Sequence, residues 1–223
     1  MNIIPAINDL SSWAVYEVRA GEGVLSAQGG ADNQHRTMSR SSEREALELF
    51  ARLRDGEGSA FEALYRHYRP RLSRFLLSLT SRRQIVEEVL DDTMMVIWTR
   101  PDSFSGASRL STWIFAIAYR KMLKALRRID EPIEDADANN RINPEPGPDQ
   151  QFDQHQLHAI LQRAMGELSP KHRAVVDLSY FHEMSYREIA EIMDCSEDTI
   201  KTRMFHARRH LRRIIASRYE ELI

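Results

Sequence analysis

The stretch SYREIAEIMDCSEDTIKTRMFHARRHLRR, residues 185–213, contains two short helical patterns separated by a tight break. Ser185 and Glu188 have the S-x-x-E spacing of a capping box, which marks a helix start. The break falls at residues 194–196, and Ser196 can cap the second helix. Apolar residues then recur at spacings of three and four, as one buried stripe requires: Ile200, Met204, Ala207, Leu211 and Ile214. The pattern predicts a helix-turn-helix.

The second of these helices is basic on its outer faces. Residues 196–218 carry seven Lys and Arg against two acids, a net charge of +5. In a helix-turn-helix the second helix presents its N-terminal outer face to the major groove of DNA, and cations attract its phosphates. The stretch therefore favours DNA binding over its plain alternative, a solvated amphipathic helix in a bundle.

Composition limits the class of protein. The chain has 223 residues, 42% of them hydrophobic, and a net charge of −2, so DNA affinity must come from local basic patches. Its one cysteine, Cys195, excludes an internal disulfide and a cysteine zinc cluster. The apolar runs are too short to span a bilayer, and the N-terminus lacks the charged start of a signal peptide. We expect a cytoplasmic protein with no membrane insertion of its own.

Clusters of glycine, proline and charged residues divide the chain into four parts. Residues 1–40 show no sustained periodicity of apolar residues, which predicts a flexible arm. One hypothesis is that translation starts at Met38. Residues 41–128 predict a helical domain, and residues 154–223 a second one that contains the helix-turn-helix. Between them, residues 129–153 hold eight acids, one Arg and four prolines, which predicts a linker. The predicted fold class is all-α: two small helical domains joined by an acidic, Pro-rich linker.

The first domain has its own helical signals. Ser42 and Ser59 each begin a capping-box pattern, Pro70 should kink the second helix, and residues 81–98 form a helix with an acidic middle. A loop at 101–111 leads into a helix from Thr112. Residues 109–128 hold six Lys and Arg and no acids, interleaved with aromatics, which suits single-stranded nucleic acid. The aromatics could equally be core residues.

Three motifs, in order around the linker, carry a family resemblance. They are F-S-G at 104–106 followed by LSTWIF at 110–115 and IA at 117–118, then LSP at 168–170 with Arg173, then the helix-turn-helix from 185 to 208. Together they cover roughly residues 42–215. In this order they resemble the extracytoplasmic-function (ECF) group of bacterial RNA polymerase sigma factors.

The resemblance implies roles for each domain. The first would bind core RNA polymerase and melt the minus-ten promoter element, and the second would read the minus-thirty-five element. Expected polymerase-binding residues are Glu88, Asp91, Asp92, Met95 and Trp98. Expected minus-ten residues are Phe104, Ser108, Arg109, Thr112, Trp113, Arg120, Lys121 and Lys124. Expected minus-thirty-five residues are Lys201, Thr202, Arg203, Phe205 and His206, with Arg208 and Arg209 on phosphate. Promoter DNA, core polymerase and an anti-sigma factor are the implied partners.

Some positions depart from the family pattern. Asp91-Asp92 stand at a usual Gln-Glu pair, Arg120 and Lys124 where Asn and Asp are common, and His206 where Arg is frequent. The first change keeps the negative charge of this helix. The other changes mean that the family pattern does not predict which promoter sequence this protein recognises. For Cys195 a redox role is conceivable, but a small residue packed in a turn is the simpler interpretation.

Other classes of function remain alternatives. The main one is a one-component helix-turn-helix repressor or activator, and another is a helical adaptor that binds only protein. For an enzyme, the sequence has no G-x-x-x-x-G-K, G-x-S-x-G or H-E-x-x-H motif. We therefore expect no catalytic residues, no metal site and no cofactor.

Overall fold

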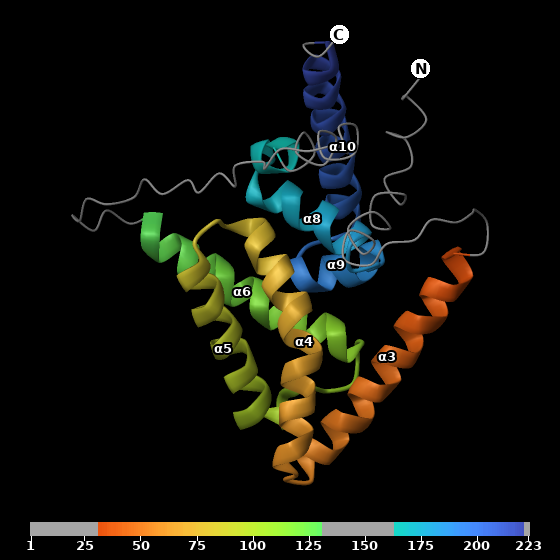
Figure 1. Ribbon diagram of the computed structural model, residues 1–223, viewed down its shortest axis with the longest axis vertical. Coiled ribbons are helices and arrows are strands. Elements are labelled where there is room, and N and C mark those ends of the chain that lie inside the picture. The colour runs from red at the N-terminus through yellow and green to blue at the C-terminus, as the bar shows by residue number, and fades with distance from the viewer. Residues whose placement is uncertain (1–30, 131–162, 221–223) are drawn as a thin grey trace, which may run out of the picture.

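The computed structural model describes residues 31–130 and 163–220, and within them it contains helices, turns and loops but no strand (Figure 1). The first half comprises α3 (Ala31–Arg54), α4 (Gly58–Leu79), α5 (Arg83–Thr99), the short 3₁₀ helix η1 (Pro101–Ser103) and α6 (Leu110–Asp130). The second half comprises α8 (Pro170–Tyr180), α9 (Tyr186–Met193) and α10 (Glu197–Glu220). The predicted all-α class is confirmed. Most of the predicted arm and linker lies outside the described residues.

The helix starts of the second half follow their sequence signals. The Ser185 hydroxyl accepts a hydrogen bond from the amide of Glu188 at 3.3 Å, and the Glu188 carboxylate accepts one from the amide of Ser185 at 2.8 Å, which completes the capping box. Ser196 accepts from the amide of Thr199 at 3.2 Å. Ser169 caps α8, with Pro170 in its first turn. These are local contacts three residues apart, so the sequence alone specifies them.

Four predicted helix starts in the first half differ from the structure, and that of α5 is Arg83 rather than residue 81. No glycine or proline interrupts residues 31–54, so α3 begins at Ala31 and passes through Ser42, and residues 31–40 of the predicted arm are helical. Helix α4 begins at Gly58 with Glu57 as its N-cap, and the Ser59 hydroxyl donates to the Glu57 carboxylate at 2.6 Å instead of capping. Helix α6 begins at Leu110, two residues before the predicted start.

Helix α4 lies at the centre of the first half and contacts α3, α5 and α6 (Figure 1). It continues as one helix through Pro70. Its buried side includes Tyr68 and Phe75, both 0% exposed, and Phe75 packs on Phe115 of α6 with ring centroids 5.4 Å apart. The core of this half is therefore built around the aromatic side of α4.

The helix-turn-helix pairs α9 with α10 through a short turn. Asp194 ends α9 in the left-handed conformation, with φ of 50°, and the amide of Cys195 bonds back to the carbonyl of Ala190 at 3.1 Å. All five residues of the predicted apolar stripe of α10 are buried, with at most 6% of each exposed. The stripe packs α10 against α8 and α9, and this fixes which face of α10 points outward.

The two halves pack on each other. Helix α9 lies against α6, and α8 lies against α4 (Figure 1). His182, between α8 and α9, is 8% exposed and packs edge-on against Phe75 and Phe115, with ring centroids 6.1 and 4.8 Å apart. Arg173 of α8 donates to the Ser78 carbonyl near the end of α4 at 2.9 Å. The sequence left the relative placement of the halves open, and the structure joins them in one core.

Candidate nucleic-acid and polymerase interfaces

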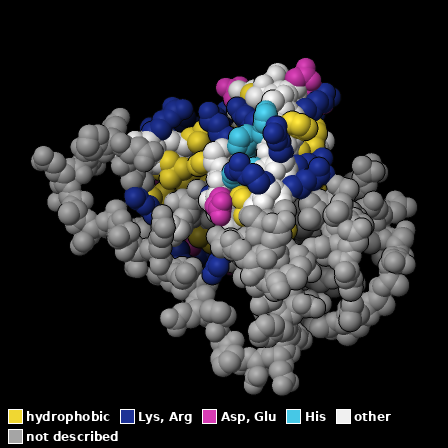
Figure 2. Space-filling view, turned by 90° about the horizontal axis from the view of Figure 1, so that it is seen from above, with side chains coloured by type: hydrophobic (Ala, Val, Ile, Leu, Met, Phe, Trp, Pro, Cys, Tyr) yellow, Lys and Arg dark blue, Asp and Glu magenta, His cyan; other side chains and the backbone are white. Residues whose placement is uncertain are grey.

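The outer face of α10 carries the residues predicted to read duplex DNA. Six of the seven are exposed, namely Lys201, Thr202, Phe205, His206, Arg208 and Arg209. Phe205 is a large apolar side chain, and it is 62% exposed. Figure 2 shows Lys and Arg side chains gathered with histidines on the end of the molecule that carries α8 and α10. The face is cationic, helical and open.

Several of these cationic side chains contact other residues of the second half. The Lys201 ammonium donates to Asp198 at 3.1 Å, and this hydrogen bond, with the charges of Asp198 and Glu197, raises the pKa of Lys201. Arg208 donates to the Tyr180 hydroxyl at 3.0 Å through Nε. Arg203 is half-buried, and its guanidinium lies 3.5 Å from the Cys195 sulfur. Cys195 is thus a turn residue packed against a predicted DNA contact.

The predicted polymerase-binding residues form one exposed stripe along α5. Glu88, Asp91, Asp92, Met95 and Trp98 follow each other at helical spacing, and all are exposed. Asp92 pairs with Lys121 of α6 at 3.0 Å, and Glu88 lies 3.9 Å from Arg128. Met95 is 58% and Trp98 45% exposed. Acids beside exposed apolar side chains are what a partner surface with cations and apolar pockets would engage.

Two predicted minus-ten residues form an aromatic cluster with α3. The ring of Phe104 lies 5.3 Å from that of Trp113 and 5.4 Å from that of Phe50, and Trp113 lies 5.8 Å from Phe50. Phe104 and Trp113 are half-buried, so both serve the core in part. Farther along α6, Arg120 and Lys124 are exposed. Lys121, between them in the sequence, forms the ion pair with Asp92 of α5.

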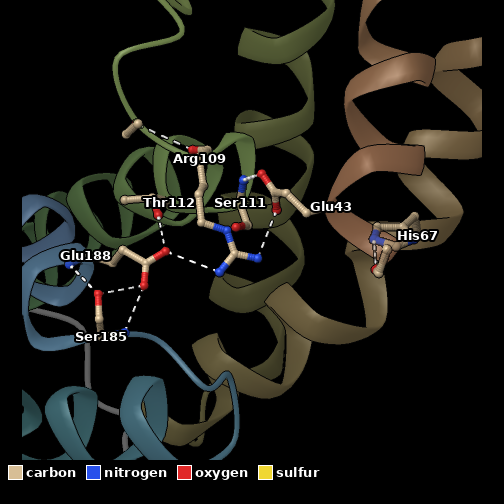
Figure 3. A network of polar contacts seen from close by, with 9 residues as sticks. Glu43, His67, Arg109, Ser111, Thr112, Ser185 and Glu188 are labelled. Atoms are coloured by element: carbon tan, nitrogen blue, oxygen red, sulfur yellow. Dashed lines mark hydrogen bonds and ion pairs between the residues drawn. The ribbon is translucent and has the colours of Figure 1, made fainter. Parts of the chain in front are cut away.

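Arg109 and Thr112 contact carboxylate groups from other helices (Figure 3). Arg109 lies 3.2 Å from an oxygen of Glu188 on α9 and 3.6 Å from one of Glu43 on α3. The Thr112 hydroxyl lies 3.5 Å from the same Glu188 oxygen. Burial would raise the pKa of Glu188, but hydrogen bonds from Ser185 and the nearby Arg109 outweigh it and hold that pKa below its usual value.

The predicted contact of Thr112 with DNA does not fit this arrangement. Thr112 is 1% exposed because α9 covers this side of α6, and Ser108 and Arg109 beside it are half-buried. The structure thus leaves open the face of α10 that is predicted to read the minus-thirty-five element, and it covers part of the surface that is predicted to bind the minus-ten element. This asymmetry could not be foreseen from the residues of either domain taken alone.

Comparison with known proteins identifies both halves. Residues 64–131 match the family model of sigma-70 region 2, and residues 158–211 match that of sigma-70 region 4. The chain is 30% identical over 175 residues to the ECF RNA polymerase sigma-E factor of Salmonella typhimurium, covering 72% of this chain and 88% of the relative. The chain belongs to the ECF group of RNA polymerase sigma factors. It is also 29% identical to the RpoE sigma factor of Cereibacter sphaeroides over 147 residues, covering 66% of this chain and 81% of that one.

The family assignment decides between the functions that the sequence left open. A sigma factor binds core RNA polymerase and directs it to promoters, and it is not an enzyme. The one-component repressor or activator is excluded because the first half matches region 2 rather than a ligand-binding domain. In the part of the chain that the structure describes, no helix of this sigma factor is long and apolar enough to cross a membrane.

Solved structures with the same fold include two complexes. One is CnrH with the cytosolic domain of CnrY, which has a TM-score of 0.57 and 21% identity and covers 78% of this sigma factor and 98% of that chain. The other is RpoE with the anti-sigma factor NepR from Bartonella quintana, which has a TM-score of 0.50 and 28% identity and covers 66% of this chain and 91% of that one.

Two residues at the contact between the halves were not predicted as functional. Glu188 was assigned only to the capping box, which uses one of its two oxygens, and the second oxygen reaches Arg109. His182 follows Tyr180 and Phe181 in the chain, and a single histidine in an apolar segment carries no specific signal. The contacts of these two residues depend on the packing of segments that are distant in the sequence, so only the structure shows them.

Proposed function

We propose that three surfaces of this sigma factor divide the work of initiation. The α5 stripe, Glu88 to Trp98, binds core polymerase through its acids and its exposed apolar residues. The loop before α6 and the basic side of α6 bind the melted minus-ten strand, where aromatics stack on bases and cations meet phosphates. The outer face of α10 reads the minus-thirty-five element in the major groove.

The observation that best supports this division is the outer face of α10. A buried stripe fixes the orientation of this helix, and the opposite side presents cations together with the exposed Phe205. An aromatic ring and cations on the N-terminal part of a second helix are suited to base edges and phosphates, respectively.

Control by an anti-sigma factor in the cytoplasm is part of the proposal. The related RpoE of the Bartonella quintana structure is bound to the anti-sigma factor NepR. Such a partner would cover the polymerase-facing or DNA-facing residues of one or both halves. The α5 stripe offers it an acidic, partly apolar docking surface that core polymerase would also need.

Transcription in vitro tests the proposed function directly. Purified core polymerase together with this protein should initiate at a promoter that core polymerase alone does not use. A duplex-binding repressor would instead bind the promoter without core polymerase and inhibit, and a protein adaptor would do neither. Absence of any core-dependent initiation on a library of genomic promoters would contradict the proposal.

Lys201→Ala should weaken promoter recognition and leave core binding unchanged. Loss of one groove or phosphate contact is expected to cost about 1–3 kcal/mol and to lower the salt dependence of binding by roughly one ion. Arg187→Ala is the matched control, because Arg187 is exposed on α9 and pairs with Glu191 of the same helix at 3.5 Å. Equal losses of promoter and core binding in Lys201→Ala would indicate a structural role for the lysine.

A further inference from the structure

Two histidines from different helices meet beside the outer face of α10. His172, near the start of α8, is half-buried, whereas His206 of α10 is exposed. Their ring centroids lie 6.4 Å apart, and the ring planes are inclined by 53°. Figure 2 shows histidine side chains among the Lys and Arg side chains at this end of the molecule. This histidine pair, His172 and His206, therefore continues the cationic surface of α10 onto α8.

The charges that act on His172 from α10 are all positive. Burial lowers the pKa of His172, and three side chains of α10 lower it further by their charge: His206, Arg203 and His210. Helices α4 and α9 also pack against α8, but no charged group that the structure describes on them contributes to this change in pKa. The charged residues nearest along the chain are the exposed Glu167, the neighbouring Lys171 and Arg173, and the buried Asp177. In the free protein, these surroundings oppose a positive charge on His172.

The hydrogen bonds of the rings decide which of these histidines can take up a proton. Arg213 lies 3.0 Å from Nδ1 of His210, and because an arginine can only donate, this nitrogen accepts and the His210 ring is neutral. The Ser169 hydroxyl lies 3.0 Å from Nδ1 of His172. A hydroxyl can donate to a neutral ring or accept from a charged one, so His172 can change its charge without losing this bond. Because Nδ1 is used in this way, Nε2 is the nitrogen that can meet a ligand.

The spacing of the histidine pair suits a phosphate group. Two charged rings this close repel each other, and an anion between them removes that repulsion. Nitrogens that each donate to an oxygen of the same phosphate, at about 2.8 Å, are roughly 5–7 Å apart, which ring centroids 6.4 Å apart allow. Arg209, a predicted phosphate contact, follows His206 by three positions and so lies on the same side of α10. A duplex held by α10 would therefore bring its backbone to the pair.

We propose that His172 and His206 together bind one backbone phosphate of the promoter duplex and take up a proton from solvent when the duplex binds. The proposal rests on the proposed function, because it requires that α10 binds duplex DNA, and it adds α8 to that interface. The phosphate raises the pKa of the pair above its value in the free protein. Affinity for DNA therefore increases as pH falls through the raised pKa, and it levels off below the pKa of the free pair.

The test measures how the full-length protein binds a short fluorescent duplex of mixed sequence at different pH values. A mixed sequence is sufficient, because a phosphate contact does not depend on the bases. Salt concentration is held constant, since phosphate contacts respond to it. The wild type should bind about tenfold more tightly near pH 6 than near pH 8, the change expected when binding raises one pKa by about one pH unit. The open outer face of α10 lets the free protein be used.

Glutamine substitutions assign the pH dependence to the pair, because glutamine can donate a hydrogen bond but cannot take up a proton here. His172→Gln and His206→Gln should each reduce the tenfold ratio to about threefold, and the double substitution should abolish it. His67→Gln is the matched control: His67 is also half-buried with a lowered pKa, but it lies in the first half beside Ser42. Circular dichroism and the thermal midpoint check that all variants are folded. A ratio that persists in the double variant, or a wild type that shows no ratio or no duplex binding, would overturn the proposal.

A second arm follows the histidine ring signals by NMR during pH titrations with and without the duplex. At least one apparent pKa of the pair should rise by about one pH unit or more when the duplex is added, whereas that of His67 should not change. An unchanged pair would overturn the proposal even if affinity varied with pH. Core-dependent transcription is measured separately. Initiation without proton uptake would refute only this inference, and proton uptake without initiation would refute only the proposed function.

Discussion

Phe75→Ala is expected to lower the free energy of unfolding by about 3–5 kcal/mol, the largest effect of any single truncation considered for this protein. Phe75 is fully buried and packs on Phe115, Tyr119 and His182, with ring centroids 5.4, 6.4 and 6.1 Å away. The alanine would leave a cavity where both halves meet. Because His182 belongs to the second half, the substitution should also loosen the contact between α8 and α4.

Phe205→Ala provides the matched comparison. It removes the same ring from a site that is 62% exposed, so its cost should stay within about 0.5 kcal/mol. Denaturant unfolding followed by circular dichroism measures both variants. Nearly equal costs would contradict the packing described for Phe75. Among molecules that remain folded, Phe205→Ala should reduce promoter recognition more than Phe75→Ala does.

Asp91→Lys is expected to weaken binding to core polymerase by about 2 kcal/mol or more, roughly thirtyfold. Asp91 lies in the middle of the exposed α5 stripe, between Glu88 and Met95. A lysine there would oppose the cationic partner that the acids of this helix are proposed to meet. Affinity for core polymerase can be measured by competition with the wild-type protein.

Glu62→Lys makes the same change of net charge away from the stripe. Glu62 is on α4, its side chain is 73% exposed, and it lies 4.0 Å from Arg66 of the same helix. Its affinity for core polymerase should match that of the wild type. If both substitutions weakened binding equally, long-range charge rather than the α5 surface would be responsible. Duplex binding by α10 should survive in both variants and serves as the check on folding.

The sequence was most informative where structure depends on contacts three or four residues apart. The caps at Ser169, Ser185 and Ser196 and the buried stripe of α10 all follow from such spacing. The same rule failed at Ser42, where an S-x-x-E pattern lies inside a helix because nothing before it breaks the helix. A capping pattern marks a helix start only where the preceding residues cannot themselves be helical.

Contacts between the halves could not be predicted in this way. Arg109 and Glu188 are 79 positions apart, and neither the period nor the local charge of either segment indicates that they meet. For Trp113 the sequence left base stacking and core packing open, and the structure shows a half-buried ring against Phe50 and Phe104. The individual DNA-contacting and polymerase-contacting residues stay predictions, which the substitutions above address.

The left-handed backbone of Asp194 limits how promoter choice can be redesigned. At φ of 50° glycine meets no steric cost and asparagine little, whereas a β-branched residue would change the angle between α9 and α10. Such a change would displace together all the α10 side chains that are proposed to contact base pairs. A combinatorial library that varies Lys201, Thr202, Phe205 and His206 should therefore hold position 194 constant, so that altered specificities arise from side-chain chemistry.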